Sequence, residues 1–221
     1  MNKYYLALIT ILIITIIGCH KKDTIDPTIT LVGSSIIKIP LNSSWTEPGF
    51  TATDDQDKDL TQSVTVEGTV NINLSGSYKL TYTVTDLSGN ESSAERIVTV
   101  YNEATYLSGK YAAHDSTSSS TNITYTATIT TSTTKNKEFY IQNFGGWNAK
   151  CNCNAFVKVQ VADTIQGSAI VWSKQIIHNA DSLHSSPGGA VISTSPLTLA
   201  FTYSWSNAST QETCTGLYIK Q

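Results

Sequence analysis

An alternation of apolar and polar residues with a period of two runs through both halves of this sequence and constrains its fold more than any other feature. Between residues 78 and 85, tyrosine, leucine and valine alternate with lysine and threonine, and residues 123–130 and 197–205 repeat the pattern. Successive side chains of a strand point to opposite faces, so this period builds strands with one buried and one wet face. We therefore expect an all-β protein.

The composition limits the size and the partners of this protein. Charged residues make up 14% of the 221 residues, and the formal net charge is −3. Arg96 is the only arginine. Proteins that bind nucleic acid cluster arginine and lysine under a basic balance, so we exclude nucleic acid as a partner. A chain of this length holds one large domain or two ordinary ones.

The N-terminus carries an export signal. Lys3 precedes an apolar run from Leu6 to Ile17. About twelve helical residues span about 18 Å, well short of the ~30 Å hydrocarbon core of a bilayer. The run is therefore predicted to be the core of a signal peptide rather than a membrane span. Ile16-Ile17-Gly18-Cys19 follows it and resembles the lipobox of bacterial lipoproteins.

The lipobox resemblance implies that residues 1–18 are removed and that Cys19 carries acyl chains such as palmitate. Several chains on one residue would anchor the protein to a membrane permanently. Residues 19–25 would then be the lipidated cysteine and a polar tether. An ordinary secretory signal followed by a chance cysteine is the alternative. We expect an outer membrane lipoprotein, at the cell surface or on the periplasmic face.

Residues 26–102 have turn-forming residues at the spacing that is typical of a sandwich of short strands. Proline and glycine separate predicted strands near residues 28–32, 36–39, 63–67, 78–85 and 95–101. Five motifs in order resemble bacterial Ig-like domains of the DUF5011/HYR-like type: Ile29–Gly33, Trp45–Asp54, Asp57–Thr61, Ser75–Tyr78 and Tyr82–Asn90. The resemblance implies an Ig-like β-sandwich that serves as a spacer or adhesion module, and it implies no chemistry.

The acidic stretch from Asp54 to Asp59 has two interpretations. Several carboxylates in one loop suit calcium, which prefers oxygen ligands. However, Lys58 interrupts the stretch, and no glycine or bidentate glutamate stands at EF-hand spacing. We favour a solvated turn whose aspartates accept hydrogen bonds from their own backbone, and we predict no metal site.

Residues 103–221 are predicted to form a second antiparallel β-barrel or sandwich. Eight runs have the character of strands, near residues 106–113, 123–130, 138–144, 157–161, 168–177, 190–194, 197–205 and 213–219. Closure of eight strands would remove exposed sheet edges. Gly109–Tyr111, Asn143–Gly146 and Cys214–Tyr218 resemble a lipocalin-like C-terminal module of bacterial lipoproteins, which implies a carrier of a small ligand.

Three cysteines remain besides the lipidated one, which is an odd number for an oxidising compartment. Cys151 and Cys153 stand two residues apart, and Cys214 lies in the last predicted strand. We expect a disulfide between Cys214 and one of the other two. Unpaired buried thiols are the first alternative. A metal site with His178 or His184 is the second, although the spacing of the two neighbouring cysteines is not that of zinc sites.

No motif in the sequence indicates catalysis. His114, His178 and His184 stand outside any known nucleophile, zinc or triad pattern, so we predict that the protein is not an enzyme and has no cofactor. Trp172 and Trp205 lie in predicted strands, where packing is the default. Trp147 follows Gly145-Gly146 in a turn, where an indole is hard to bury, and is our candidate ligand contact.

Two functions remain open at this point. The first is a non-enzymatic, membrane-anchored lipoprotein whose Ig-like spacer presents a terminal β-domain for binding or adhesion to a glycan or protein. The second is a lipocalin-like carrier of a small apolar or glycan ligand. A carrier needs an internal cavity of roughly 300 Å³ or more. The large residues that alternate over 197–205 favour a filled interior.

Overall fold

The computed structural model describes residues 23–146, 156–161, 169–171, 175–178, 181–184, 189–206 and 211–221. These residues form strands, turns and short 3-10 helices, which confirms the all-β prediction. None of the helices in these ranges is long and apolar enough to cross a membrane. The chain divides into two compact units. One comprises Met1–Ser35, Glu47–Gly68 and Leu80–Arg96, and the other comprises Ile36–Thr46, Thr69–Lys79 and Ile97–Gln221.

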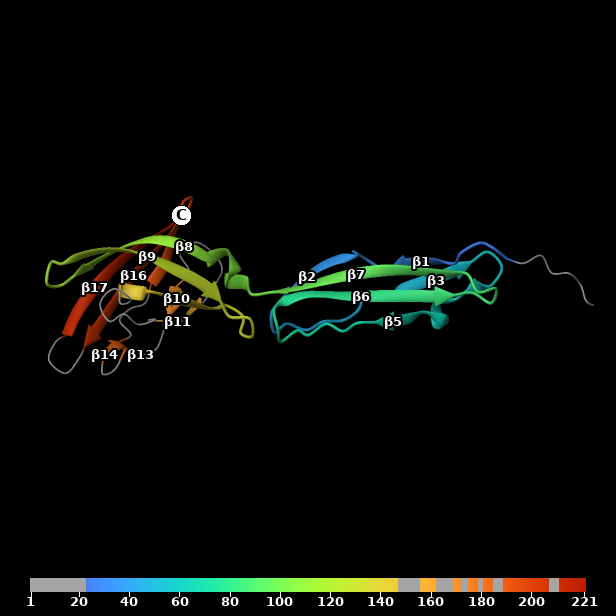
Figure 1. Cartoon of the computed structure of the whole chain (residues 1–221), viewed down its shortest axis with the longest axis horizontal. Helices are drawn as coiled ribbons and strands as arrows, with labels where there is room; N and C mark the ends of the chain where they lie inside the picture. The colour runs from blue at the N-terminus through green and yellow to red at the C-terminus, as the bar shows by residue number, and fades with distance from the viewer. Residues whose placement is uncertain are drawn as a thin grey trace, which may run out of the picture. The chain divides into compact units, whose positions relative to one another are not determined.

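Seven strands of the N-terminal region form two sheets, with strand orders β1-β3-β4 and β2-β7-β6-β5 (Figure 1). Their bounds are β1 Thr28–Leu31, β2 Ile36–Pro40, β3 Phe50–Asp54, β4 Lys58–Asp59, β5 Thr65–Glu67, β6 Gly76–Thr85 and β7 Glu91–Tyr101. A 3-10 turn, η1 (Thr61–Ser63), joins β4 to β5. β2 pairs with β7 in parallel, whereas the pairs β1–β3, β3–β4 and β5–β6 are antiparallel.

The predicted alternation on β6 is present in the structure. Leu80, Tyr82 and Val84 are buried, and the threonines between them are half-buried or exposed. Val84 packs with Ala52 and Leu60 in the core of the first unit. All five strands predicted here exist, and β3 and β4 were not predicted.

Arg96 is fully buried in β7 and satisfied by backbone oxygens. Its guanidinium donates to the carbonyls of Ser34 at 2.6 Å, Val32 at 2.9 Å and Gly49 at 3.1 Å. Nε donates to the Tyr82 hydroxyl at 3.3 Å, and one terminal nitrogen lies 3.1 Å from Glu47 Oε1. The carbonyls belong to the segments that follow β1 and precede β3, so this one side chain ties both segments to β7.

Ten strands of the C-terminal region form one curled sheet (Figure 1). Their bounds are β8 Gly109–Thr117, β9 Asn122–Thr131, β10 Glu138–Gln142, β11 Phe156–Val161, β12 Ala169–Val171, β13 Gln175–His178, β14 Asp181–His184, β15 Gly189–Thr194, β16 Leu197–Ser206 and β17 Gln211–Lys220. Eight of them pair in a closed ring, because β8-β9-β10-β11-β12-β15-β16-β17 are consecutive antiparallel neighbours and β17 returns to β8. The hairpin of β13 and β14 joins this ring at the end of β16.

Large side chains fill the interior of the described part of this sheet. Leu199, Phe201 and Tyr203 of β16 are buried, as their alternation predicted. Phe144, from the short helix η3 (Phe144–Gly146), packs among them with its ring centroid 4.6 Å from that of Tyr203. The other core residues are Ala104, Leu107, Tyr111, Ala113, Ala127, Ile129, Phe139, Ile141, Cys214 and Tyr218.

Asn102 fixes the backbone where β7 passes into the helix η2 (Glu103–Leu107). Its side-chain amide donates at 2.9 Å to the carbonyls of Ser132, Lys135 and Glu138. Its side-chain oxygen accepts from the amide of Ala104. The buried amide of Asn102 therefore ties the loop between β9 and β10 to the start of the C-terminal region, and hydrogen bonds between Glu103 and Asn136 reinforce this connection.

Candidate functional site

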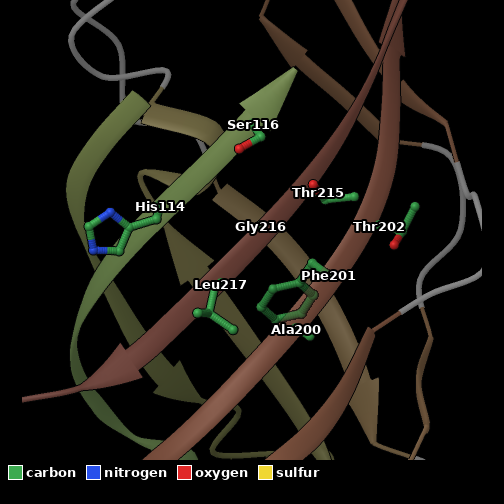
Figure 2. Close-up of a pocket in the computed structure, with 8 residues that line it drawn as sticks. All are labelled: His114, Ser116, Ala200, Phe201, Thr202, Thr215, Gly216 and Leu217. Carbon is green, nitrogen blue, oxygen red and sulfur yellow. The ribbon is translucent and has the colours of Figure 1, made fainter. Parts of the chain in front are cut away.

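The neighbouring strands β8, β17 and β16 share an outer face with a hollow of about 490 Å³. Figure 2 shows the residues that line it on these three strands. They are His114 and Ser116 of β8, Thr215, Gly216 and Leu217 of β17, and Ala200, Phe201 and Thr202 of β16.

The strand registers arrange six of these residues in two rows. Ser116 lies opposite Thr215, which lies opposite Thr202, so one row carries three hydroxyls. In the second row His114 lies opposite Leu217, and Leu217 lies opposite Ala200. The hollow thus combines hydroxyls and an imidazole with a small apolar patch, and the residues that line it include no carboxylate.

This lining suits the binding of a neutral polar ligand. Hydroxyls donate and accept hydrogen bonds, and Leu217, which is 38% exposed, offers apolar contact. A serine nucleophile requires a base within hydrogen-bond reach. The Ser116 hydroxyl instead donates to Asn122 Oδ1 at 2.8 Å. The hydrogen-bond partner of Ser116 is therefore an amide oxygen and not a catalytic base.

Asp115, between the two lining residues of β8, points to the opposite face and is buried in the interior. Its Oδ2 accepts hydrogen bonds from the hydroxyls of Tyr125 at 2.6 Å and Tyr203 at 2.5 Å. The Tyr125 hydroxyl is also hydrogen-bonded to that of Tyr218. The backbone amide of Gly145 donates to Tyr125 at 2.8 Å and to Tyr218 at 3.4 Å. A polar cluster thus lies inside an otherwise apolar core.

Burial sets the electrostatics of this cluster. Loss of hydration raises the pKa of Tyr125, Tyr203 and Tyr218 well above the usual tyrosine value, and the negative charge of Asp115 raises each pKa further. The carboxylate fits because Gly216 stands opposite Asp115 across the strand pair. A Cβ on Gly216 would lie 2.5 Å from Asp115 Oδ1 and 2.9 Å from a ring carbon of Tyr218.

Sequence reasoning missed this cluster, although one signal was available. Tyr111, Ala113 and Asp115 follow each other at a period of two, so an aspartate stands at a position that the pattern reserves for the core. Its partners could not be found in the same way, because the alternation gives only the face of Tyr125, Tyr203 and Tyr218 and not their contacts.

The structure places only some of the candidate residues from the sequence. Cys214 is buried on β17 in the core. His114, which stands outside any catalytic or zinc motif in the sequence, lines the hollow. The remaining candidates lie outside the residues that the structure describes, so the predictions on them stay predictions: Cys19, Trp147, Cys151, Cys153, Trp172 and the side chains of His178, His184 and Trp205.

The acidic stretch forms the predicted turn between β3 and β4. Asp54 Oδ2 accepts from the backbone amides of Gln56 at 2.8 Å and Asp57 at 2.9 Å, as in an Asx turn. Carboxylates from elsewhere in the sequence join it. Oxygens of Asp54, Asp57 and Asp86 lie within 4.8 Å of one another, and so do those of Asp23, Asp54 and Asp55. The sequence pattern did not indicate that Asp23 and Asp86 are neighbours of this turn.

Two solved structures are among those similar to the chain. A lipoprotein of Bacteroides thetaiotaomicron matches 88% of this chain and 100% of its own with 20% identity and a TM-score of 0.38. A structure of Clostridium perfringens ZmpB, with the CBM51-2 domain in complex with GlcNAc and INT domains, matches 54% of this chain and 30% of its own with 20% identity and a TM-score of 0.30.

No curated protein matches the sequence. The comparison with family models concerns the N-terminal sandwich, in the region where the sequence motifs had indicated an Ig-like domain. Residues 29–100 match the family described as bacterial surface protein, Ig-like domain.

Proposed function

We propose that this chain is a non-enzymatic, membrane-anchored lipoprotein that presents a binding domain outside the cytoplasm. In this proposal Cys19 carries the lipid and the Ig-like region is the spacer. The C-terminal sheet is then the domain that binds a glycan or protein. Residues 29–100, which follow the lipobox, match a bacterial surface Ig-like family, and this match supports the proposed location outside the cytoplasm. The proposed location is the outer membrane, at the cell surface or on its periplasmic face.

One observation carries the choice of a binding domain over a carrier. Side chains such as Phe139, Phe144 and Tyr218 pack the interior of the described sheet, whereas a hollow of about 490 Å³ opens on its outer face. A carrier holds its ligand inside, and a surface-binding domain fills its interior with its own side chains. The position of the hollow therefore supports recognition from outside the sheet.

The anchor is tested by labelling cells with an alkyne analogue of palmitate. The wild-type protein is expected to take up the label and to sediment with membranes. Cys19→Ala is expected to lose the label and to appear in the soluble fraction. Label that persists in the variant would contradict the proposal.

The binding surface is tested with an array of glycans and surface proteins, probed with residues 20–221. Thr215→Trp fills the hollow between its two hydroxyl neighbours and is expected to weaken any signal at least tenfold. Lys38→Trp, on β2 far along the sequence, is the matched control. Equal signals for the two variants would place recognition elsewhere on the protein.

A further inference from the structure

The turn that joins β6 to β7 exposes a leucine in the first unit. Leu87 is 92% exposed, and Ile25 nearby is 55% exposed. The two lie at the same end of the unit, because Asn90 Nδ2 donates to the Ile25 carbonyl at 3.2 Å. Single exposed aliphatic residues are common on soluble proteins and need no explanation by themselves. Their surroundings provide the further evidence.

The turn holds Leu87 outward through hydrogen bonds rather than by packing. The Asp86 amide donates to the Asn90 carbonyl at 3.0 Å, and the Asn90 amide donates back to Asp86 Oδ1 at 2.7 Å. The Leu87 amide donates to Asp57 Oδ2 at 2.8 Å. These bonds fix the backbone on both sides of a side chain that contacts almost only solvent.

The chain enters the first unit at this same end (Figure 1). Asp23 is buried there, with a carboxylate oxygen within 4.8 Å of those of Asp54 and Asp55. Only four peptide steps separate Cys19 from Asp23. Even a fully extended chain covers about 14 Å in four residues. A lipid on Cys19 would therefore hold this end of the unit within about 14 Å of the bilayer surface.

Charge indicates which lipid surface fits. Asp86 precedes the exposed leucine, and Asp57 accepts a hydrogen bond from its amide. Asp26 and Asp55 are exposed at the same end, where Lys58 is an exposed cation. The surplus of carboxylates would repel anionic headgroups, whereas zwitterionic headgroups with an outer primary ammonium carry no net charge and can donate hydrogen bonds to the carboxylates. Apolar side chains within such an interface gain the free energy of leaving water.

We propose that Leu87 and Ile25 insert into a lipid surface rich in ammonium headgroups when the protein is anchored. This docking rests on the proposed lipidation of Cys19. It would hold this end of the unit against the bilayer, so that the anchored protein could not rotate freely about its tether.

The test uses the full lipidated protein in vesicles of phosphatidylethanolamine and phosphatidylcholine with brominated acyl chains. Bromine quenches tryptophan on contact, so Leu87→Trp reports insertion after the signal of the native tryptophans is subtracted. Val66→Trp is the control, because Val66 is 44% exposed and pairs with Tyr82. Tyr82 stands three residues before the end of β6, about 10 Å along the strand, and Leu87 lies in the turn beyond that end. We expect at least threefold stronger quenching for the tryptophan at position 87, with melting temperatures equal to wild type.

The outcomes separate the docking from the anchor. Equal quenching at both positions, with protein that floats with the vesicles, would overturn the docking and leave the proposed anchor intact. Protein that fails to float would overturn both. Blue-shifted emission at position 87 without bromine quenching would place the residue against protein, such as a second copy, and would also overturn the docking.

Discussion

Arg96 joins distant backbone segments of the N-terminal sandwich. Three backbone carbonyls accept hydrogen bonds from its guanidinium. We expect Arg96→Met to lower the free energy of unfolding by about 3–5 kcal/mol, because those acceptors and the buried part of Glu47 lose their donor. Arg96→Lys should recover little, since an ammonium lacks the planar fork. Urea unfolding measures both, with Lys79→Met as the control. A loss below about 1 kcal/mol would contradict this assignment.

The three tyrosines around Asp115 make a prediction about alkaline pH. Burial raises the pKa of Tyr125, Tyr203 and Tyr218 in the folded state, whereas an unfolded tyrosine titrates near a pKa of about 10. Below that pH both states hold the protons, and this contribution to stability is complete. Above it only the unfolded state releases them. The free energy of unfolding should then fall by up to about 1.4 kcal/mol per pH unit for each tyrosine.

Two measurements at alkaline pH check this behaviour. The near-ultraviolet absorbance of tyrosinate from these three residues should not rise before circular dichroism shows that the protein unfolds. Tyr203→Phe should lessen the slope of stability against pH by the contribution of one residue. Release of all tyrosine protons before unfolding begins would refute the argument.

At the residue scale, the sequence predicted which face of a strand a side chain lies on better than it predicted which residues that side chain contacts. The pattern correctly placed Leu80, Tyr82 and Val84 on the buried face of β6. It could not show that Arg96 meets the carbonyls of Val32 and Ser34, because these residues are 64 and 62 positions away. Hydrogen bonds between such distant segments depend on the whole fold and leave no periodic trace.

At the element scale, strands with a long alternation were predicted in place, whereas some short ones were predicted and others were merged or missed. β6, β9 and β16 each span ten residues and appear where the pattern put them. The predicted run 168–177 is instead divided between β12 and β13, and β14 was missed. Three or four residues hold too few alternations to separate a strand from a loop. The short helices η1, η2 and η3 were missed for the same reason.

The pairing of β8 with β17 requires a glycine. We predict that Gly216→Ala destabilises the protein by about 1–3 kcal/mol, because the new methyl group would overlap the Asp115 carboxylate. Gly76→Ala is the matched control, since its Cβ would meet Tyr78 at 3.7 Å, an ordinary contact distance. Denaturant unfolding compares the two variants. Equal midpoints would show that the carboxylate has space to move.

The last strand also carries the cysteine for which we predict a disulfide. Cys214 is buried on β17 in the same core as Phe144, and Cys151 follows Phe144 in the sequence after a short segment. A bridge from Cys214 to Cys151 or Cys153 would close a loop of about 60 residues and stabilise the fold by about 4 kcal/mol in the chain-entropy model. Thiol counting on denatured, unreduced protein from the exported fraction should find one free thiol per chain. Three would exclude the bridge.

At the scale of the whole molecule, the residues that the structure describes form two separate hydrophobic cores. One is built around Ala52, Leu60 and Val84, and the other around the rings of Phe144, Phe201 and Tyr218. The sequence predicted two β regions because the alternation stops and resumes near residue 102. It could not locate the outer hollow, because that surface exists only where three strands from distant parts of the chain pair side by side.

Two cores with no shared residue predict two unfolding transitions for the full chain. Scanning calorimetry should resolve the two transitions. Arg96→Met and Gly216→Ala should each shift the melting temperature of only one of them. For Arg96→Met, a loss of about 3 kcal/mol corresponds to a fall of roughly 12 °C or more in the melting temperature of a region of this size. Gly216→Ala should lower the other transition and leave the first in place, because its overlap with Asp115 lies in the second core. If both substitutions shift one common transition, the two regions unfold together, and the Ig-like region could not then serve as an independent spacer.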